Sequence, residues 1–220
     1  MKKLLKSILV VTMLLCMSLS SVSALGSISK PGTIGEWDGD NANKEEYELV
    51  WNELEVQDVN RFDANLRNEM KKVNYGEKSI KDYLTQVGLS GSFPKNTTSV
   101  ILIQEIRDLL YRNKETKEYK YITNVTVTWE VPTLVEGMGD IYIYHYDETA
   151  KRHELFKPLS VNYANKTVTV KFDDLCPVGV VAIKSTKKPV DTSAVGFGSI
   201  FGIIAMGAGA FYVLNNKKED

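Results

Sequence analysis

Two histidines near the middle of the β-rich part of this chain are the residues whose types and spacing point most directly to chemistry. The stretch DETAK has the composition of a tight turn, and a hairpin folded on it places His145 opposite His153. Opposite residues of an antiparallel pair share one face of a sheet, so the two imidazoles would lie side by side and could begin a metal site. Because a complete site needs further ligands, we expect two solvent-side histidines and no bound cofactor.

The strand that carries His145 also has three tyrosines at alternate positions, Tyr142, Tyr144 and Tyr146. Tyrosine offers a large contact area at low entropic cost, so an exposed stripe suits an extracellular protein or glycan ligand. The spacing of Tyr142 and Tyr146 also resembles the Tyr-x-x-x-Tyr pair of haem-binding NEAT modules, which implies haem or metal handling as the alternative function. Strands are rich in tyrosine in general, and burial in the core is the competing interpretation.

No catalytic constellation accompanies these residues in the sequence. The stretch GLSGS at 88–92 places a glycine one position too early for a nucleophile elbow. Cys176 precedes a proline at a predicted strand corner, where a buried apolar role is favoured over that of a nucleophile. The composition is mildly acidic without a concentrated basic face, which argues against a nucleic-acid partner. We therefore expect a binding or structural protein and not an enzyme.

The elements that position these side chains follow from hydrophobic periodicity in the segment 45–184. Apolar residues recur at helical spacing from 60 to 73 and again from 80 to 87, and Gly76 and Gly88 can end the two helices. The helical part 60–88 is therefore predicted as a small two-helix insertion beside a β-rich part, 99–184.

Period-two alternation predicts the strands. The segment 119–131 is expected to form one long strand, and the stretch SVILIQEIRDLLY begins as a strand but leaves its second half open between strand and helix. The other predicted strands are 47–56, 139–146, 152–156, 166–172 and 177–183. Six or seven strands at short intervals indicate a mainly β (α+β) fold, an Ig-like β-sandwich ectodomain.

Both ends of the chain have the composition of targeting segments. Residues 1–24 combine lysines, a short apolar run and small residues, which predicts a secretory signal peptide. Residues 25–44 are rich in Gly, Asp and Asn and are expected to form a flexible lead-in. Beyond a charged spacer, 185–193, an apolar stretch predicts a transmembrane helix at 194–215, and the lysines that follow place the tail 216–220 in the cytoplasm.

Three stretches carry a family resemblance, namely NVTVTWEVPTL, GDIYIYHYDETAKRHELFKP and KTVTVKFDDLCPVGVVAIK. They resemble a β-rich module of clostridial (Gram-positive) cell-surface proteins over residues 119–184, with Cys176 at the place of the usual serine. The resemblance implies architecture and surface display and carries no activity.

The C-terminus resembles a sortase sorting signal, in which a Pro-x-Thr-Gly-type peptide precedes an apolar helix and a basic tail. The matching residues are Pro189, Thr192 and Ser193, with two residues instead of one between Pro189 and Thr192. This likeness implies a sortase and the cell wall as partners, whereas a permanent anchor would have the membrane alone. In either case we expect a non-enzymatic bacterial surface protein, with its N-terminal domain extracellular, that serves in binding, adhesion or structure.

Overall fold

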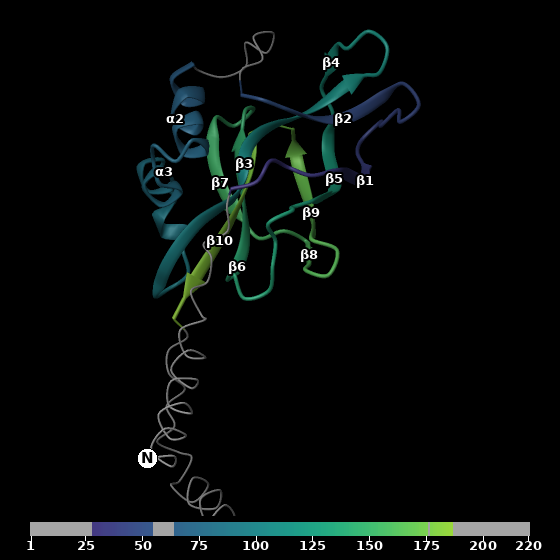
Figure 1. The fold of residues 1–220 in the computed structure, drawn as a ribbon. Coiled ribbons are helices and arrows are strands. Elements are labelled where there is room, and N and C mark those ends of the chain that lie inside the picture. The colour runs from purple at the N-terminus through teal and green to yellow at the C-terminus, as the bar shows by residue number, and fades with distance from the viewer. Residues whose placement is uncertain (1–27, 55–63, 176, 187–220) are drawn as a thin grey trace, which may run out of the picture. The chain divides into compact units, whose positions relative to one another are not determined.

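The computed structural model describes residues 28–54, 64–175 and 177–186 (Figure 1). The predicted leader 1–24, membrane helix 194–215 and tail 216–220 lie outside the described residues, as do Cys176, Pro189, Thr192, Ser193 and all but the start of the spacer. No helix in the described part is long and apolar enough to cross a membrane.

The described part contains ten strands and two α-helices. The strands are β1 (Ile34–Asp38), β2 (Tyr47–Asn52), β3 (Thr97–Asn113), β4 (Tyr119–Lys120), β5 (Thr123–Glu130), β6 (Asp140–Asp147), β7 (Arg152–Phe156), β8 (Ser160–Asn162), β9 (Thr167–Asp174) and β10 (Pro177–Ser185). The helices are α2 (Ala64–Asn74) and α3 (Ile80–Gln86), followed by a 3₁₀ turn, Leu89–Ser92. The expectation of a mainly β fold with a two-helix insertion is confirmed, although the strands outnumber the predicted six or seven.

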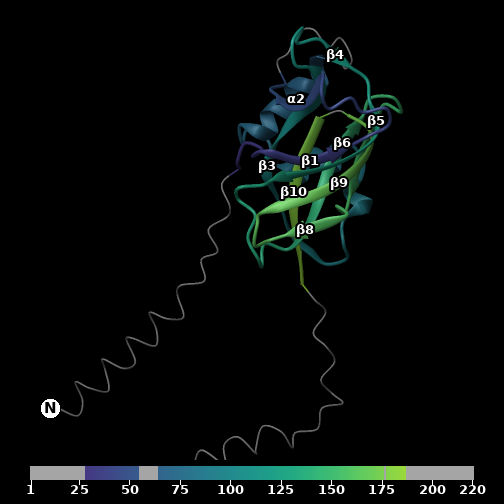
Figure 2. The same cartoon turned by 90° about the vertical axis from the view of Figure 1, so that its right-hand side faces the viewer.

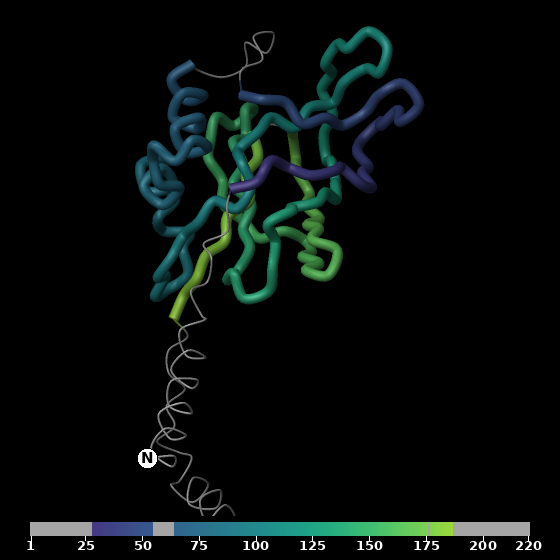
Figure 3. The backbone as a smooth tube through the Cα atoms, viewed as in Figure 1, coloured from purple at the N-terminus to yellow at the C-terminus, as the bar shows by residue number. Residues whose placement is uncertain are grey.

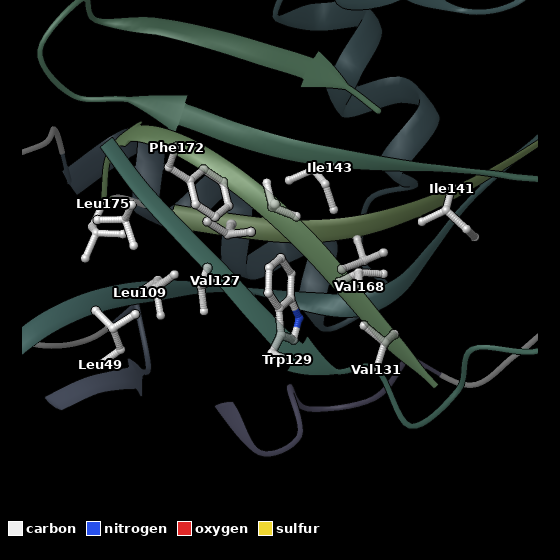
Figure 4. Close-up of a cluster of buried hydrophobic side chains, with 14 of the residues drawn as sticks. Leu49, Leu109, Val127, Trp129, Val131, Ile141, Ile143, Val168, Phe172 and Leu175 are labelled. Carbon is white, nitrogen blue, oxygen red and sulfur yellow. The ribbon is translucent and has the colours of Figure 1, made fainter. Parts of the chain in front are cut away.

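The strands form two antiparallel sheets. The smaller sheet has the order β1-β5-β9-β8, and the larger has the order β2-β3-β10-β6-β7, with β4 pairing to β3. Figure 2 shows β8 and β9 of the smaller sheet crossing β10 of the larger one. Apolar side chains of both sheets meet in the space between the sheets (Figure 4). The smaller sheet contributes Trp129 of β5 and Phe172 of β9, and the larger contributes Leu109 of β3 and Ile143 of β6. This arrangement is a face-to-face packing of two sheets.

The two helices cover the other face of the larger sheet, so this sheet is buried on both sides (Figure 1). Met70 of α2 and Leu84 of α3 pack there against Ile106 of β3 and Val181 of β10. Both helices end as predicted, with Gly76 and Gly88 in the left-handed conformation just beyond their last turns.

Burial on both faces explains the sequence that was ambiguous between strand and helix. The stretch SVILIQEIRDLLY is continuous β structure within the long strand β3, which pairs with β2 on one side and with β10 and β4 on the other. A strand that contacts apolar groups on both faces loses the alternation of polar and apolar residues. Its sequence therefore contains matches to a helical period as well.

The predicted long strand 119–131 is wrong, because the chain changes sheets within it. Residues 119 and 120 form β4 and pair with β3 of the larger sheet, whereas β5 begins at Thr123 and pairs with β9 of the smaller sheet. Tyr121, between them, is 56% exposed. The alternation that continues through Tyr119 and Tyr121 therefore does not reflect one strand.

The predicted flexible lead-in 25–44 also needs correction, because it contains strand β1. This edge strand pairs with β5, and its two inward side chains, Ile34 and Trp37, pack against the core between the sheets. The register shifts between these two residues, so the inward positions are three apart and not two. The irregular spacing hides the strand from a search for alternation.

Candidate functional site

The hairpin of β6 and β7 has a register that separates the two histidines. Tyr146 pairs with His153, and His145 pairs with Glu154, one residue away from the predicted register. A shift by one residue moves a side chain to the other face of the sheet. The shift arises because Asp147 stays within β6, where its carboxylate accepts a hydrogen bond from Ala150 N at 2.7 Å across the turn. The predicted pairing of two imidazoles is therefore wrong.

The described residues contain no group of three or more His, Cys, Asp or Glu side chains that could hold a metal ion. His153 lies on the face of the larger sheet that the helices cover, where its ring contacts those of Tyr83, Tyr144 and Tyr146. His145 lies on the opposite face, toward the smaller sheet, and contacts Phe172. The geometry that suggested a metal site is thus not formed by this hairpin.

The three tyrosines of β6 are buried and do not form an exposed stripe. Tyr142, Tyr144 and Tyr146 are 9%, 0% and 7% exposed and pack beneath the helices. The Tyr144 hydroxyl lies 2.8 Å from the Tyr83 hydroxyl of α3 and 2.8 Å from His153 Nδ1. Burial raises the pKa of Tyr144 well above its usual value and lowers the pKa of His153. The tyrosines therefore hold the helices to the sheet and do not face a haem or an external ligand.

His145 is buried, so the expectation of a solvent-side histidine is wrong for it, and it lies among polar groups of both sheets, where its Nε2 and Asp174 Oδ1 make no hydrogen bond within the described part of the chain. Its Nδ1 lies 3.2 Å from Glu154 Oε2 of β7, and its Nε2 lies 3.6 Å from Asp174 Oδ1 of β9. The other carboxylate oxygen of Asp174 accepts a hydrogen bond from the Thr149 hydroxyl at 3.1 Å. The Thr149 hydroxyl is thus bonded to the Asp174 carboxylate and not to the His145 imidazole. A nucleophile activated by histidine would need the second bond, so the arrangement favours a structural role. Sequence reasoning did not identify Asp174.

A different surface, the outer face of the smaller sheet, carries a hollow with an aromatic residue and several polar groups in its lining. Here Thr126 and Thr128 of β5 and Thr167 and Thr169 of β9 point outward, because they alternate with valines that point into the core. Thr128 and Thr169 pair across the strands, and their hydroxyl oxygens lie 2.8 Å apart. Above them is a shallow pocket of about 650 Å³, which we call the outer pocket. It is lined by Gly35, Glu36, Trp37, Asp38, Lys44, Thr126, Thr128 and Thr169.

Trp37 lines the β1 edge of the outer pocket, although its side chain is directed toward the core between the sheets and is only partly exposed. Its indole packs edge to face against Tyr111 of β3, with the ring centroids 5.8 Å apart. The Lys44 ammonium lies 5.3 Å from the centroid of the indole and 3.5 Å from Asp38 Oδ1. The pocket therefore combines an aromatic ring, carboxylates and hydroxyls. Sequence reasoning missed it because β1 was taken as a loop, although the alternation of threonine and valine in β5 and β9 indicates the threonine face.

Other hollows in the described part are less suited to a ligand. A pocket of about 260 Å³ lies between α2 and β3, but its Arg107 is engaged by Glu105 at 2.8 Å and by Glu53 at 3.3 Å. A hollow of about 380 Å³ beside His145 is smaller and is bordered by the polar contacts described above. Another of about 620 Å³ lies beside α2, but its Glu69 is engaged by Lys72 at 2.6 Å and by Lys78 at 2.7 Å. The outer pocket is therefore the candidate site.

Comparison with known proteins identifies no relative of the chain. No family model matches it, and neither does any curated protein or solved structure. The fold supports the class of mainly β proteins with two antiparallel sheets and helices over one of them. Function has to be argued from the outer pocket and from the sequence.

Proposed function

We propose that the chain is a non-enzymatic bacterial cell-surface protein that binds an extracellular protein or glycan through the outer pocket. In this proposal the described unit is an Ig-like sandwich displayed outside the cell, and residues 194–215 attach it to the membrane or direct it to the wall. The leader and the apolar C-terminal stretch support display. The outer pocket is the observation that supports binding.

The position of the outer pocket favours binding, because the faces of the larger sheet are already covered. Helices cover one face of that sheet, and the smaller sheet covers the other. The outer face of the smaller sheet carries no helix in the described part of the chain (Figure 1). A pocket with an aromatic ring and a few polar groups on such a face has the composition of a ligand site.

Gly35 offers a way to block the pocket without disturbing the fold. A Cβ atom at this position would lie 3.4 Å from the nearest atom, the carbonyl oxygen of Thr128, so a side chain can be accommodated and would occupy the pocket. Gly35→Gln should abolish capture of the full-length protein on an array of glycans and extracellular proteins. The matched control is Gly91→Gln on the 3₁₀ turn, where no atom lies within 4 Å of the new Cβ. Equal capture of both variants would reject the outer pocket as the binding site.

Display is tested separately at the C-terminus. Cells expressing the full chain are fractionated, and the C-terminal peptide of the protein is identified by mass spectrometry. Sorting predicts a chain that ends at Thr192 and is linked to a wall peptide. Permanent anchoring predicts an intact chain that detergent extracts from the membrane. Recovery of the protein in the cytoplasm, with residues 1–24 still attached, would contradict surface display in either form.

A further inference from the structure

The outer pocket already holds a cation of its own, the side chain of Lys44. We propose that the pocket binds the ammonium group of an amino-sugar glycan, and that Lys44 occupies the place of this ammonium when no ligand is bound. This inference rests on the proposed binding function and specifies the ligand class. It starts from the position of the Lys44 ammonium beside the Trp37 ring and the Asp38 carboxylate. An aromatic ring together with a carboxylate is a recognised combination for binding ammonium groups.

The Lys44 side chain can leave this place while its backbone stays fixed. The side chains of Lys44 and Asp38 are 54% and 81% exposed, and an ion pair so open to water is weak. The backbone is held by the neighbouring loop, because Lys114 Nζ donates to the carbonyl oxygens of Lys44 and Glu45 at 2.6 and 3.0 Å. Figure 3 shows the two loops concerned, 39–46 and 113–118, projecting at the same end of the unit. A ligand therefore has to displace one side chain and not a loop.

The charges of the pocket favour a cation at the end near β1. Glu36 and Asp38 line the pocket from this strand, and Glu36 has no ion-pair partner within the described residues. Lys171 lies opposite Thr126 across the β5–β9 pair and flanks the other end of the threonine face. An incoming ammonium should therefore sit beside the carboxylates of β1, away from Lys171.

The threonines decide between a sugar and a lysine side chain as the carrier of the ammonium. Thr126, Thr128 and Thr169 present hydroxyls that both donate and accept hydrogen bonds. The hydroxyls of a sugar ring can form further hydrogen bonds with them, whereas the aliphatic stem of a lysine offers none and would only displace water from them. The combination of one ammonium subsite with a row of hydroxyls therefore matches an amino sugar with a free amine.

Calorimetric titration of the full-length protein in neutral detergent tests the ligand class. The probes are a soluble glucosamine oligomer with free amines, the same oligomer fully N-acetylated, and an oligolysine peptide of equal charge. We expect binding of the free-amine oligomer, and at least tenfold weaker binding of the other two. Equal affinity for the N-acetylated oligomer would overturn the role of the ammonium. Equal or tighter binding of oligolysine would overturn the choice of a glycan.

Variants distinguish specific binding in the outer pocket from non-specific attraction between an acidic protein and a cationic ligand. Asp38→Asn should weaken binding about threefold to fivefold, as expected for one exposed ion pair. Lys44→Met should strengthen it, because the internal competitor loses its charge while its length is kept. The matched controls are Glu136→Gln and Lys81→Met, at exposed positions outside the pocket, and should leave affinity unchanged.

Equal effects of Asp38→Asn and Glu136→Gln would show non-specific attraction and reject the proposal. Weaker binding by Lys44→Met would also reject it, because Lys44 would then assist the ligand and not compete with it. The proposed function keeps its own readout, the loss of array capture in Gly35→Gln. If this loss is observed but the free-amine oligomer does not bind, only the ligand class is overturned.

Discussion

Asp108 gives the sharpest prediction for the stability of this fold. The carboxyl group lies on β3, 4% exposed, on a strand that is paired on both sides. Burial raises its pKa from 3.8 to about 7, against the attraction of Arg67 on α2 and with a further contribution from Glu148. The folded protein therefore binds this proton more tightly than the unfolded chain does. The contribution of Asp108 to stability is therefore fully present below pH 3.8 and is lost as the pH rises through about 7.

The size of this effect follows from the two pKa values. Each tenfold change in proton affinity corresponds to about 1.36 kcal/mol, so ionisation of Asp108 lowers the free energy of unfolding by about 4 kcal/mol over the whole range. About 2 to 3 kcal/mol of this loss falls between about pH 5 and about pH 8. Asp108→Asn removes the charge and nearly keeps the shape. Between about pH 5 and about pH 8 the free energy of unfolding of the variant should therefore fall by about 2 to 3 kcal/mol less than that of the wild type.

Urea unfolding of the wild type and the variant at both pH values measures the difference. Comparing the two proteins removes the contribution of all other titrating groups, which they share. Asp173→Asn is the matched control, because this carboxylate is exposed on β9 and its removal should leave the pH dependence unchanged. If the free energies of unfolding of the wild type and Asp108→Asn fall in parallel between the two pH values, the account of a buried, destabilising carboxylate is refuted.

Three further substitutions test the packing. Tyr83→Phe removes the hydrogen bond to Tyr144 and should cost about 1 kcal/mol, seen as a melting temperature lower by about 2 to 4 °C; an unchanged melting temperature would contradict it. Gly139→Ala should lower the free energy of unfolding in urea by about 3 kcal/mol, because the φ of +118° and the nearby Ile183 carbonyl exclude a Cβ atom. Gly91→Ala is the control and should leave the free energy of unfolding unchanged. Trp129→Phe leaves the buried Gln104 Oε1 unpaired and should cost about 2 kcal/mol by the same measurement, whereas a neutral effect would show that another group replaces the indole.

The sequence was sufficient where local chemistry determines local structure. Both helices, their glycine ends and the hairpin between β6 and β7 were predictable, because each depends on residues close together in the chain. The strands β9 and β10 were predictable from alternation and from a short apolar run. The register of the hairpin was not, because the hydrogen bond from Ala150 N to the Asp147 carboxylate keeps Asp147 in the strand. One residue of difference was enough to separate the predicted pair of histidines.

Long-range packing could not be predicted from alternation. Tyr142, Tyr144 and Tyr146 do share one face of β6, as their spacing indicates, but the spacing does not say what lies on that face. Their burial depends on α3, whose Tyr83 meets Tyr144 from a position 61 residues earlier in the chain. The same limit applies to Trp37, which contacts Tyr111 from an edge strand with irregular spacing.

The layered arrangement explains why the candidate site contains threonines and not tyrosines. Because the larger sheet is buried on both faces, its aromatic residues are committed to packing. A strand face open to water needs side chains that are both polar and favourable in β structure, and threonine meets both conditions. A ligand on that face must therefore be recognised mainly through hydroxyls and carboxylates, with Trp37 on the edge strand β1 supplying the aromatic surface. This division of roles makes a polar, hydroxyl-rich partner better suited to the outer pocket than an apolar one.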